Sequence, residues 1–135
     1  MSKTVFSFPA SLTNEQPAQQ AIEHDRAGSC VWKIIKEAIS MDAPMKNIAK
    51  AEVLRLADQV EYQDGQIVSK TLVQNEAVSI TLFAFDKGEE ISTHESGGDA
   101  FVTCLDGTGE ITIDGVKYEL HEGESIVMPA KHPHA

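Results

Sequence analysis

The segment Glu110-Ile-Thr-Ile-Asp-Gly-Val-Lys-Tyr-Glu-Leu120 predicts the fold more clearly than any other part of the chain. Apolar and polar residues alternate on both sides of Asp114-Gly115, a pair that favours the two-residue turn of a β-hairpin. Similar short runs, rich in β-branched residues, lie around this hairpin and are separated by glycines or charged turns. The expected strands are Gln66–Val73, Ala77–Phe85, Ala100–Leu105, Glu110–Ile113, Val116–Leu120 and Ser125–Met128. Because no helical pattern separates them, they predict an all-β sandwich or barrel, of which the jelly roll is one form.

The part of the chain before these strands has a different pattern. Residues 1–20 are polar and rich in glutamine, so we expect an extended arm with little structure of its own. From Ser29 to Ile39, apolar residues recur at helical spacing, with lysine and glutamate on the opposite face. We therefore divide the chain into an arm with an amphipathic helix (1–48) and a β-barrel domain (49–135). The apolar face of the helix is expected to pack on the barrel or on a second subunit of a homodimer.

Composition excludes several classes of function. The chain has 135 residues, 41% of them apolar, which suits one compact domain. Its 21 acidic residues outnumber its 11 basic ones, and the lysines are scattered, so nucleic-acid binding is disfavoured. Cys30 and Cys104 form neither a zinc-ribbon motif nor a disulfide framework. The apolar runs are too short to span a membrane and no signal-peptide pattern is present, so we expect a cytoplasmic protein without membrane partners.

Two motifs in the β half resemble those of the cupin family. The first family motif reads Gly, five residues, His, one residue, His, three or four residues, Glu, six residues, Gly. The second reads Gly, five residues, Pro, one residue, Gly, two residues, His, three residues, Asn. The matching residues are Gly88, His94 and Gly107 in the first motif and Gly123, Pro129 and His134 in the second. Ser96, Ala100 and Lys131 stand where the family has His, Glu and Gly. The resemblance covers Glu61 to Ala135.

The resemblance implies a small jelly-roll barrel, also called a double-stranded β-helix. In metal-binding members, three His and one Glu hold a divalent ion such as iron, manganese, nickel, cobalt or zinc. Only His94 and His134 occupy those positions here, so the implied ligand set is incomplete.

Three functions remain open from the sequence. The first is a barrel that binds a small organic molecule in its mouth, with or without a divalent metal. The second is a metal-dependent enzyme of the dioxygenase, isomerase or decarboxylase type, acting on a small carbonyl or carboxylate substrate. The third is a sensor or structural barrel without turnover, and the fold alone does not choose among them.

Strand parity suggests further residues of the pocket. If Ala100 faces inward, Val102 and Cys104 do so too, because side chains alternate across a strand. Cys104 then serves as a core residue, a substitute ligand or a nucleophile. The expected pocket residues are Ser96, Val102, Cys104, Met128 and His132. His132 shares the parity of His134, which leaves a group of three imidazoles with His94 as an alternative.

Other polar residues near the motifs are expected to face solvent. They are His121, Glu95 and Asp99.

The position of the second motif raises a question about the sheet edge. Cupin barrels continue with at least one more strand after this motif, whereas the given sequence ends at Ala135. We expect that the natural chain is longer, or that Val5–Phe8 or a partner subunit occupies the place, and we favour the first.

Overall fold

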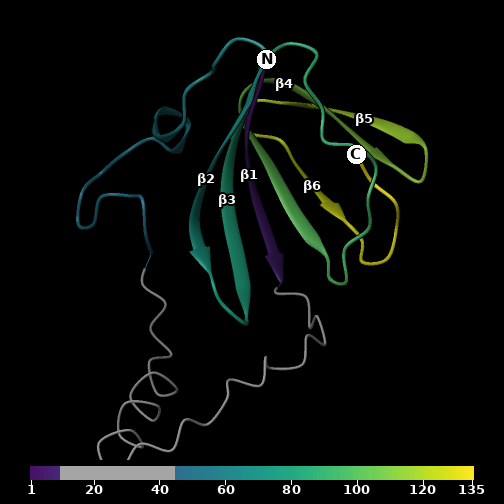
Figure 1. Ribbon diagram of the computed structural model, residues 1–135, viewed down its shortest axis with the longest axis horizontal. Helices are drawn as coiled ribbons and strands as arrows, with labels where there is room; N and C mark the ends of the chain where they lie inside the picture. Colours follow the sequence, from purple (N-terminus) through teal and green to yellow (C-terminus); the bar gives the residue numbers. More distant parts are fainter. Residues whose placement is uncertain (10–44) are drawn as a thin grey trace, which may run out of the picture.

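A computed structural model describes residues 1–9 and 45–135 of the chain (Figure 1). The elements are β1 (Ser2–Pro9), the 3-10 helix η1 (Leu56–Gln59), β2 (Ile67–Gln74), β3 (Val78–Phe85), β4 (Ala100–Ile113), β5 (Val116–His121) and β6 (Ser125–Met128). The helix predicted at Ser29–Ile39 lies outside the described residues. Within the described ranges, no helix is long and apolar enough to cross a membrane.

The strands form one antiparallel sheet in the order β2-β3-β1-β4-β5, and β6 pairs with β4. The predicted all-β class and the strands of the second half are thereby confirmed. At the β4–β5 turn, Asp114 and Gly115 have φ of 51° and 79°, the left-handed pair that a type I′ hairpin turn needs. The turn residues that define the hairpin in the sequence therefore also form it in the structure.

Strand β1 differs most from expectation. It pairs with β3 along Ser2 to Pro9 and with β4 along Ser2 to Ser7, so it lies inside the sheet (Figure 1). The polar composition of residues 1–20 predicted an extended arm with little structure of its own, and this prediction is wrong for Ser2–Pro9. Within that polar arm, Thr4, Phe6 and Phe8 alternate with Lys3, Val5 and Ser7, a period-2 pattern that suits a strand with both faces covered. Among the three alternatives given above for completing the sheet was pairing by Val5–Phe8, and these residues do pair within the sheet, between β3 and β4.

Strand β4 joins two segments that were predicted as separate strands. Its first half pairs with β1 and β6, and its second half pairs with β5. Gly107, with φ of 74°, lies between the halves, close to the register shift between Lys3 and Thr4. Ala100 and Ile113, at opposite ends of β4, belong to the same hydrophobic cluster. The strand therefore curls around one core, as a barrel requires.

Each face of the sheet carries its own hydrophobic cluster. The inner cluster includes Phe6, Val102, Ile111, Leu120 and Met128. The outer cluster is formed by Val60, Leu72, Val73, Leu82 and Ala84, against which Ile48, Leu56 and Tyr62 pack. The segment 45–62 thus covers the outer face, and the inner face is left to form the barrel interior.

Polar contacts fix this covering segment to the sheet. The Tyr62 hydroxyl donates to Oδ2 of Asp106 at 2.7 Å, and Lys3 Nζ donates to the carbonyl of Ala57 at 2.8 Å. Lys3 Nζ also lies 4.9 Å from the centre of the Tyr62 ring. Burial and the Asp106 carboxylate raise the pKa of Tyr62 above its ordinary value near 10, so the phenol stays protonated and donates at neutral pH.

Candidate functional site

A cavity of about 470 Å³ opens from the barrel interior. Its walls come from β1, the end of β3, the segment 86–94, the second half of β4, one residue each of β5 and β6 (Leu120 and Met128), and the last two residues of the described chain. The volume falls within the range of pockets that hold small organic ligands, about 300 to 1,000 Å³. Because several elements far apart in the sequence contribute, the cavity depends on the complete barrel.

One wall of the cavity is aromatic. Phe6 and Phe8 of β1 stack at 5.7 Å between ring centres, and Phe83 and Phe85 of β3 stack at 5.8 Å. Phe6 and Phe83 connect the two pairs edge to face at 5.1 Å. The i, i+2 spacing places each pair on one face of its strand, and the antiparallel pairing of β1 with β3 brings the pairs together. A cluster of four aromatic rings results, suited to contact with an apolar group.

His94 and His134 meet at the cavity. Their backbones form a bridge, in which each N–H donates to the other residue's carbonyl, at 2.9 Å from His94 and 2.8 Å from His134. Their ring centres are 4.4 Å apart. Both line the cavity, His94 as an exposed side chain and His134 as one with only 1% of its surface exposed. The structure therefore brings the two motif histidines together.

The hydrogen bonds of the two rings indicate which nitrogen carries the proton. Nδ1 of His94 lies 3.0 Å from the carbonyl oxygen of Ser92, and Nδ1 of His134 lies 2.9 Å from that of His132. A carbonyl oxygen only accepts, so each Nδ1 carries a proton. In the neutral ring, Nε2 then has a free lone pair, and it can accept a hydrogen bond or bind a metal ion.

Two buried side-chain polar atoms within the described ranges have no hydrogen-bond partner, and both belong to residues that line this cavity. They are Nε2 of His134 and Oγ1 of Thr4. Thr4 is 3% exposed. Buried polar atoms are nearly always hydrogen-bonded, because a missing partner costs about 1 to 3 kcal/mol. A ligand that forms a hydrogen bond with either atom would remove this cost, so these two residues are the candidate polar contacts of a ligand.

Acidic side chains surround the cavity opening. Asp86, Glu89 and Glu90 follow β3, and Glu110 lies on β4. The backbone N–H of Gly65 donates to Asp86 Oδ2 at 2.7 Å, and this bond is the main cause that holds the pKa of Asp86 below its ordinary value. Glu110 forms an exposed ion pair with Lys117 at 2.9 Å.

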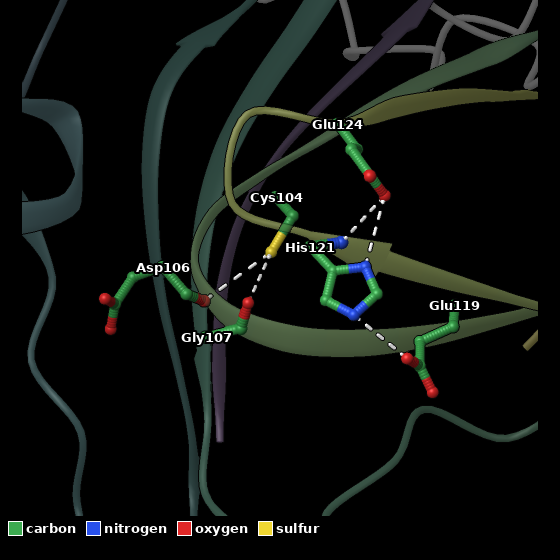
Figure 2. Close-up of polar contacts among 6 residues, drawn as sticks. All are labelled: Cys104, Asp106, Gly107, Glu119, His121 and Glu124. Carbon is green, nitrogen blue, oxygen red and sulfur yellow. Dashed lines mark hydrogen bonds and ion pairs between the residues drawn. The ribbon is translucent and has the colours of Figure 1, made fainter.

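Of the five residues expected in the pocket, Met128 lines the cavity. Val102 and Cys104 face inward as parity predicted, but they are fully buried in the inner cluster and do not reach the cavity surface. The Cys104 thiol lies 3.5 Å from the carbonyl oxygens of Asp106 and Gly107, and burial raises its pKa (Figure 2). A protonated, enclosed thiol is a core residue, and the nucleophile alternative for Cys104 loses its support.

Ser96 and His132 also lie away from the cavity lining. The Ser96 hydroxyl donates to the carbonyl of Gly98 at 2.6 Å. His132 is exposed, and its Nδ1 lies 2.6 Å from Asp114 Oδ2. Parity does not apply to His132, because Lys131 has φ of 61° and the segment is no regular strand. The alternative group of three imidazoles is therefore not formed.

The side chains expected to face solvent do so. His121 is exposed, with Nε2 3.0 Å from Glu119 and Nδ1 3.4 Å from Glu124 (Figure 2). Glu95 and Asp99 are exposed, and Asp99 accepts the Ala130 N–H at 2.8 Å. These contacts stabilise loops outside the cavity.

The aromatic wall, Thr4 and the acidic turn were missed as site residues. The sequence does contain a signal for the wall, since Thr4, Phe6 and Phe8 alternate, as do Phe83 and Phe85. This alternation indicates an aromatic wall only when β1 is known to pair with β3, because the pairing brings the two phenylalanine pairs together.

Comparisons with known proteins agree with this geometry. A family model for the cupin domain matches residues 81–135. A conserved protein of unknown function from Streptococcus pyogenes is 50% identical with a TM-score of 0.65, and the match covers 67% of this chain and 79% of that one. A cupin superfamily protein from Desulfitobacterium hafniense is 35% identical with a TM-score of 0.65, covering 68% of this chain and 84% of that one. The chain belongs to the cupin superfamily.

A third solved cupin extends the comparison to a longer protein. The cupin 2 conserved barrel domain protein from Leptotrichia buccalis is 47% identical with a TM-score of 0.59, and the match covers 60% of this chain and 39% of that one. No curated protein matches the chain. The comparisons identify the cupin family and its barrel, and the names of these relatives specify no ligand.

The residues of this cupin do not fit a metal site held by the protein alone. His94 and His134 offer two Nε2 donors, and among the described residues no group of three or more His, Cys, Asp or Glu side chains is arranged to hold a metal ion. Protein metal centres of this type use three or four protein ligands. The family positions that would supply the others hold Ser96 and Ala100.

Proposed function

We propose that this cupin is a cytoplasmic, homodimeric protein that binds a small organic molecule in its barrel cavity. The apolar body of the ligand lies against the aromatic wall of Phe6, Phe8, Phe83 and Phe85. Its polar group donates a hydrogen bond to Nε2 of His134. The single observation that carries the proposal is the buried, unpartnered Nε2 of His134 at a cavity of ligand size.

The chemistry of the lining supports a ligand of mixed character. Stacking and burial against phenylalanine rings supply the affinity for an apolar group. His134 Nε2 accepts a hydrogen bond, while the hydroxyl of Thr4 both donates and accepts. A ligand with a hydroxyl or amine therefore satisfies atoms that otherwise remain unpaired.

A metal-dependent cupin enzyme is the second candidate. The observation in its favour is the orientation of both motif imidazoles, whose Nδ1 atoms are held by backbone carbonyls as in metal-ligating histidines. We rank it second because two imidazoles lack both the further donors and the negative charge that balance a divalent cation.

The test is a fragment screen by thermal shift and ligand-observed NMR on the full chain, in the presence of EDTA. We expect small aromatic alcohols and amines to bind. EDTA should not prevent this binding, because the proposed site uses no metal ion. His134→Leu and Thr4→Val should each weaken binding by about tenfold, since each removes one polar partner. Thr4→Val keeps the side-chain shape and removes an unpaired oxygen, so it should not lower the free energy of unfolding.

The matched control for the histidine variant is His132→Leu, which changes an exposed histidine two residues away. We expect it to leave fragment binding unchanged. Absence of binding by any fragment, or equal binding by wild type, His134→Leu and Thr4→Val, would refute the proposed site. The screen is repeated without EDTA, and binding that is seen only there would favour the metal-dependent candidate instead.

A further inference from the structure

The cavity lining also carries information about the charge of the ligand. Four carboxylates line it: Asp86, Glu89, Glu90 and Glu110. In the described part of the chain, no Lys or Arg side chain is part of the lining. Two cations lie close by, the α-amino group of Met1, which helps to lower the pKa of Asp86, and Lys117, which pairs with Glu110. Negative groups thus outnumber positive ones by four to two.

The interior of the cavity, like its acidic lining, favours a positively charged ligand group. Four phenylalanine side chains line it, and a cation is attracted to the face of an aromatic ring. His134 Nε2 and Thr4 Oγ1 are buried and unpartnered, and both can accept hydrogen bonds from an ammonium group. A carboxylate in the same place would meet the other carboxylates of the lining, without a lining Lys or Arg side chain to pair with in the described part of the chain.

We infer that the ligand of this cavity is an organic amine with an aromatic or branched apolar body, bound as its ammonium form. This inference rests on the proposed function and makes it more specific. The ammonium group donates hydrogen bonds to His134 Nε2 and Thr4 Oγ1, and the apolar body stacks on the phenylalanine wall. The acidic side chains at the opening raise the local concentration of cations. An ammonium ligand differs from the small carbonyl or carboxylate substrate that the sequence suggested for an enzyme, so the inference disfavours that substrate class.

Three probes with the same indole body test the inference. Tryptamine is a cation at neutral pH, tryptophol is neutral and indole-3-acetate is an anion. We expect tryptamine to bind about tenfold more tightly than tryptophol in NMR titrations of the full chain, with indole-3-acetate weakest. Because the whole chain carries a net charge of −10, a control for non-specific attraction is needed.

Two double variants provide that control. Glu89→Gln/Glu90→Gln removes two carboxylates of the cavity opening, and Glu119→Gln/Glu122→Gln removes two exposed carboxylates outside the lining. Both change the net charge equally. We expect only the first to reduce the preference for tryptamine over tryptophol, by about threefold to tenfold.

The outcomes separate this inference from the proposed function. Equal or tighter binding of indole-3-acetate would overturn the amine inference and leave the organic-ligand site standing. Equal effects of the two double variants would show that the preference comes from the overall charge, and would overturn the inference as well. If none of the three probes binds but other fragments of the screen do, only the inference fails. If nothing binds, both fail.

Discussion

Phe6→Ala is expected to lower the free energy of unfolding by about 3 to 5 kcal/mol. Phe6 is 8% exposed, belongs to the inner cluster and contacts both Phe8 and Phe83. Its truncation removes a large apolar side chain where β1 holds β3 and β4 together, and the neighbouring strands cannot collapse into the space. Chemical denaturation followed by circular dichroism measures the effect.

Phe101→Ala is the matched control for this change. Phe101 lies on β4, pairs with Ser7 of β1 and is 49% exposed. The same substitution there should cost less than about 1 kcal/mol, because little apolar surface is buried. Equal costs at the two positions would contradict the placement of β1 inside the sheet.

Gly107→Ala is expected to cost more than about 2 kcal/mol, the second large effect. Two causes add at this position. Gly107 has φ of 74°, a left-handed conformation that side chains disfavour, and a Cβ here would overlap the carbonyl group of Met1. The alanine variant therefore strains its own backbone and displaces the start of β1, where Met1 and Ser2 line the cavity.

Gly115→Ala separates the two causes, because Gly115 has φ of 79° and open space around it. Its cost should be about 1 to 2 kcal/mol from the backbone conformation alone. Thermal unfolding of both variants gives the comparison. If Gly107→Ala costs no more than Gly115→Ala, the close approach of the N-terminal strand to β4 is wrong.

The strands of the second half could be predicted from the sequence because their signals are local. Alternation and the Asp114-Gly115 turn specify the β4–β5 hairpin without reference to any other part of the chain. β1 could not be predicted in the same way. Its eight residues lie in a polar stretch, and what makes them a strand is pairing with two segments that lie between 69 and 105 residues further along the chain.

The candidate site was predictable only in part for the same reason. Motif spacing identified His94 and His134, which the structure brings together. Parity correctly indicated that Val102 and Cys104 face inward. It gives only the side of the strand on which a side chain lies, and does not tell whether that side chain reaches the cavity surface. Thr4 and the aromatic wall depend on the position of β1. Their role therefore appears only in the folded chain.

The cavity chemistry also explains why the family motif alone was insufficient for a functional assignment. With Ser96 and Ala100 at two of the four family positions, the two remaining imidazoles act in this account as hydrogen-bonding groups. The fold then provides a cavity with an aromatic wall and a buried side-chain nitrogen that has no hydrogen-bond partner. We propose that such a site binds an organic molecule through its own side chains.

The most direct test of the central account is ¹⁵N NMR of the imidazole rings in the free full chain and in the chain saturated with the fragment of largest thermal shift. We predict that His134 carries its proton on Nδ1, and that the Nε2 resonance of His134 shifts in proportion to bound fragment while the resonances of the exposed His132 stay constant. A proton on Nε2 in the free neutral ring, or an unchanged His134 Nε2 resonance at saturation, would contradict the proposed site.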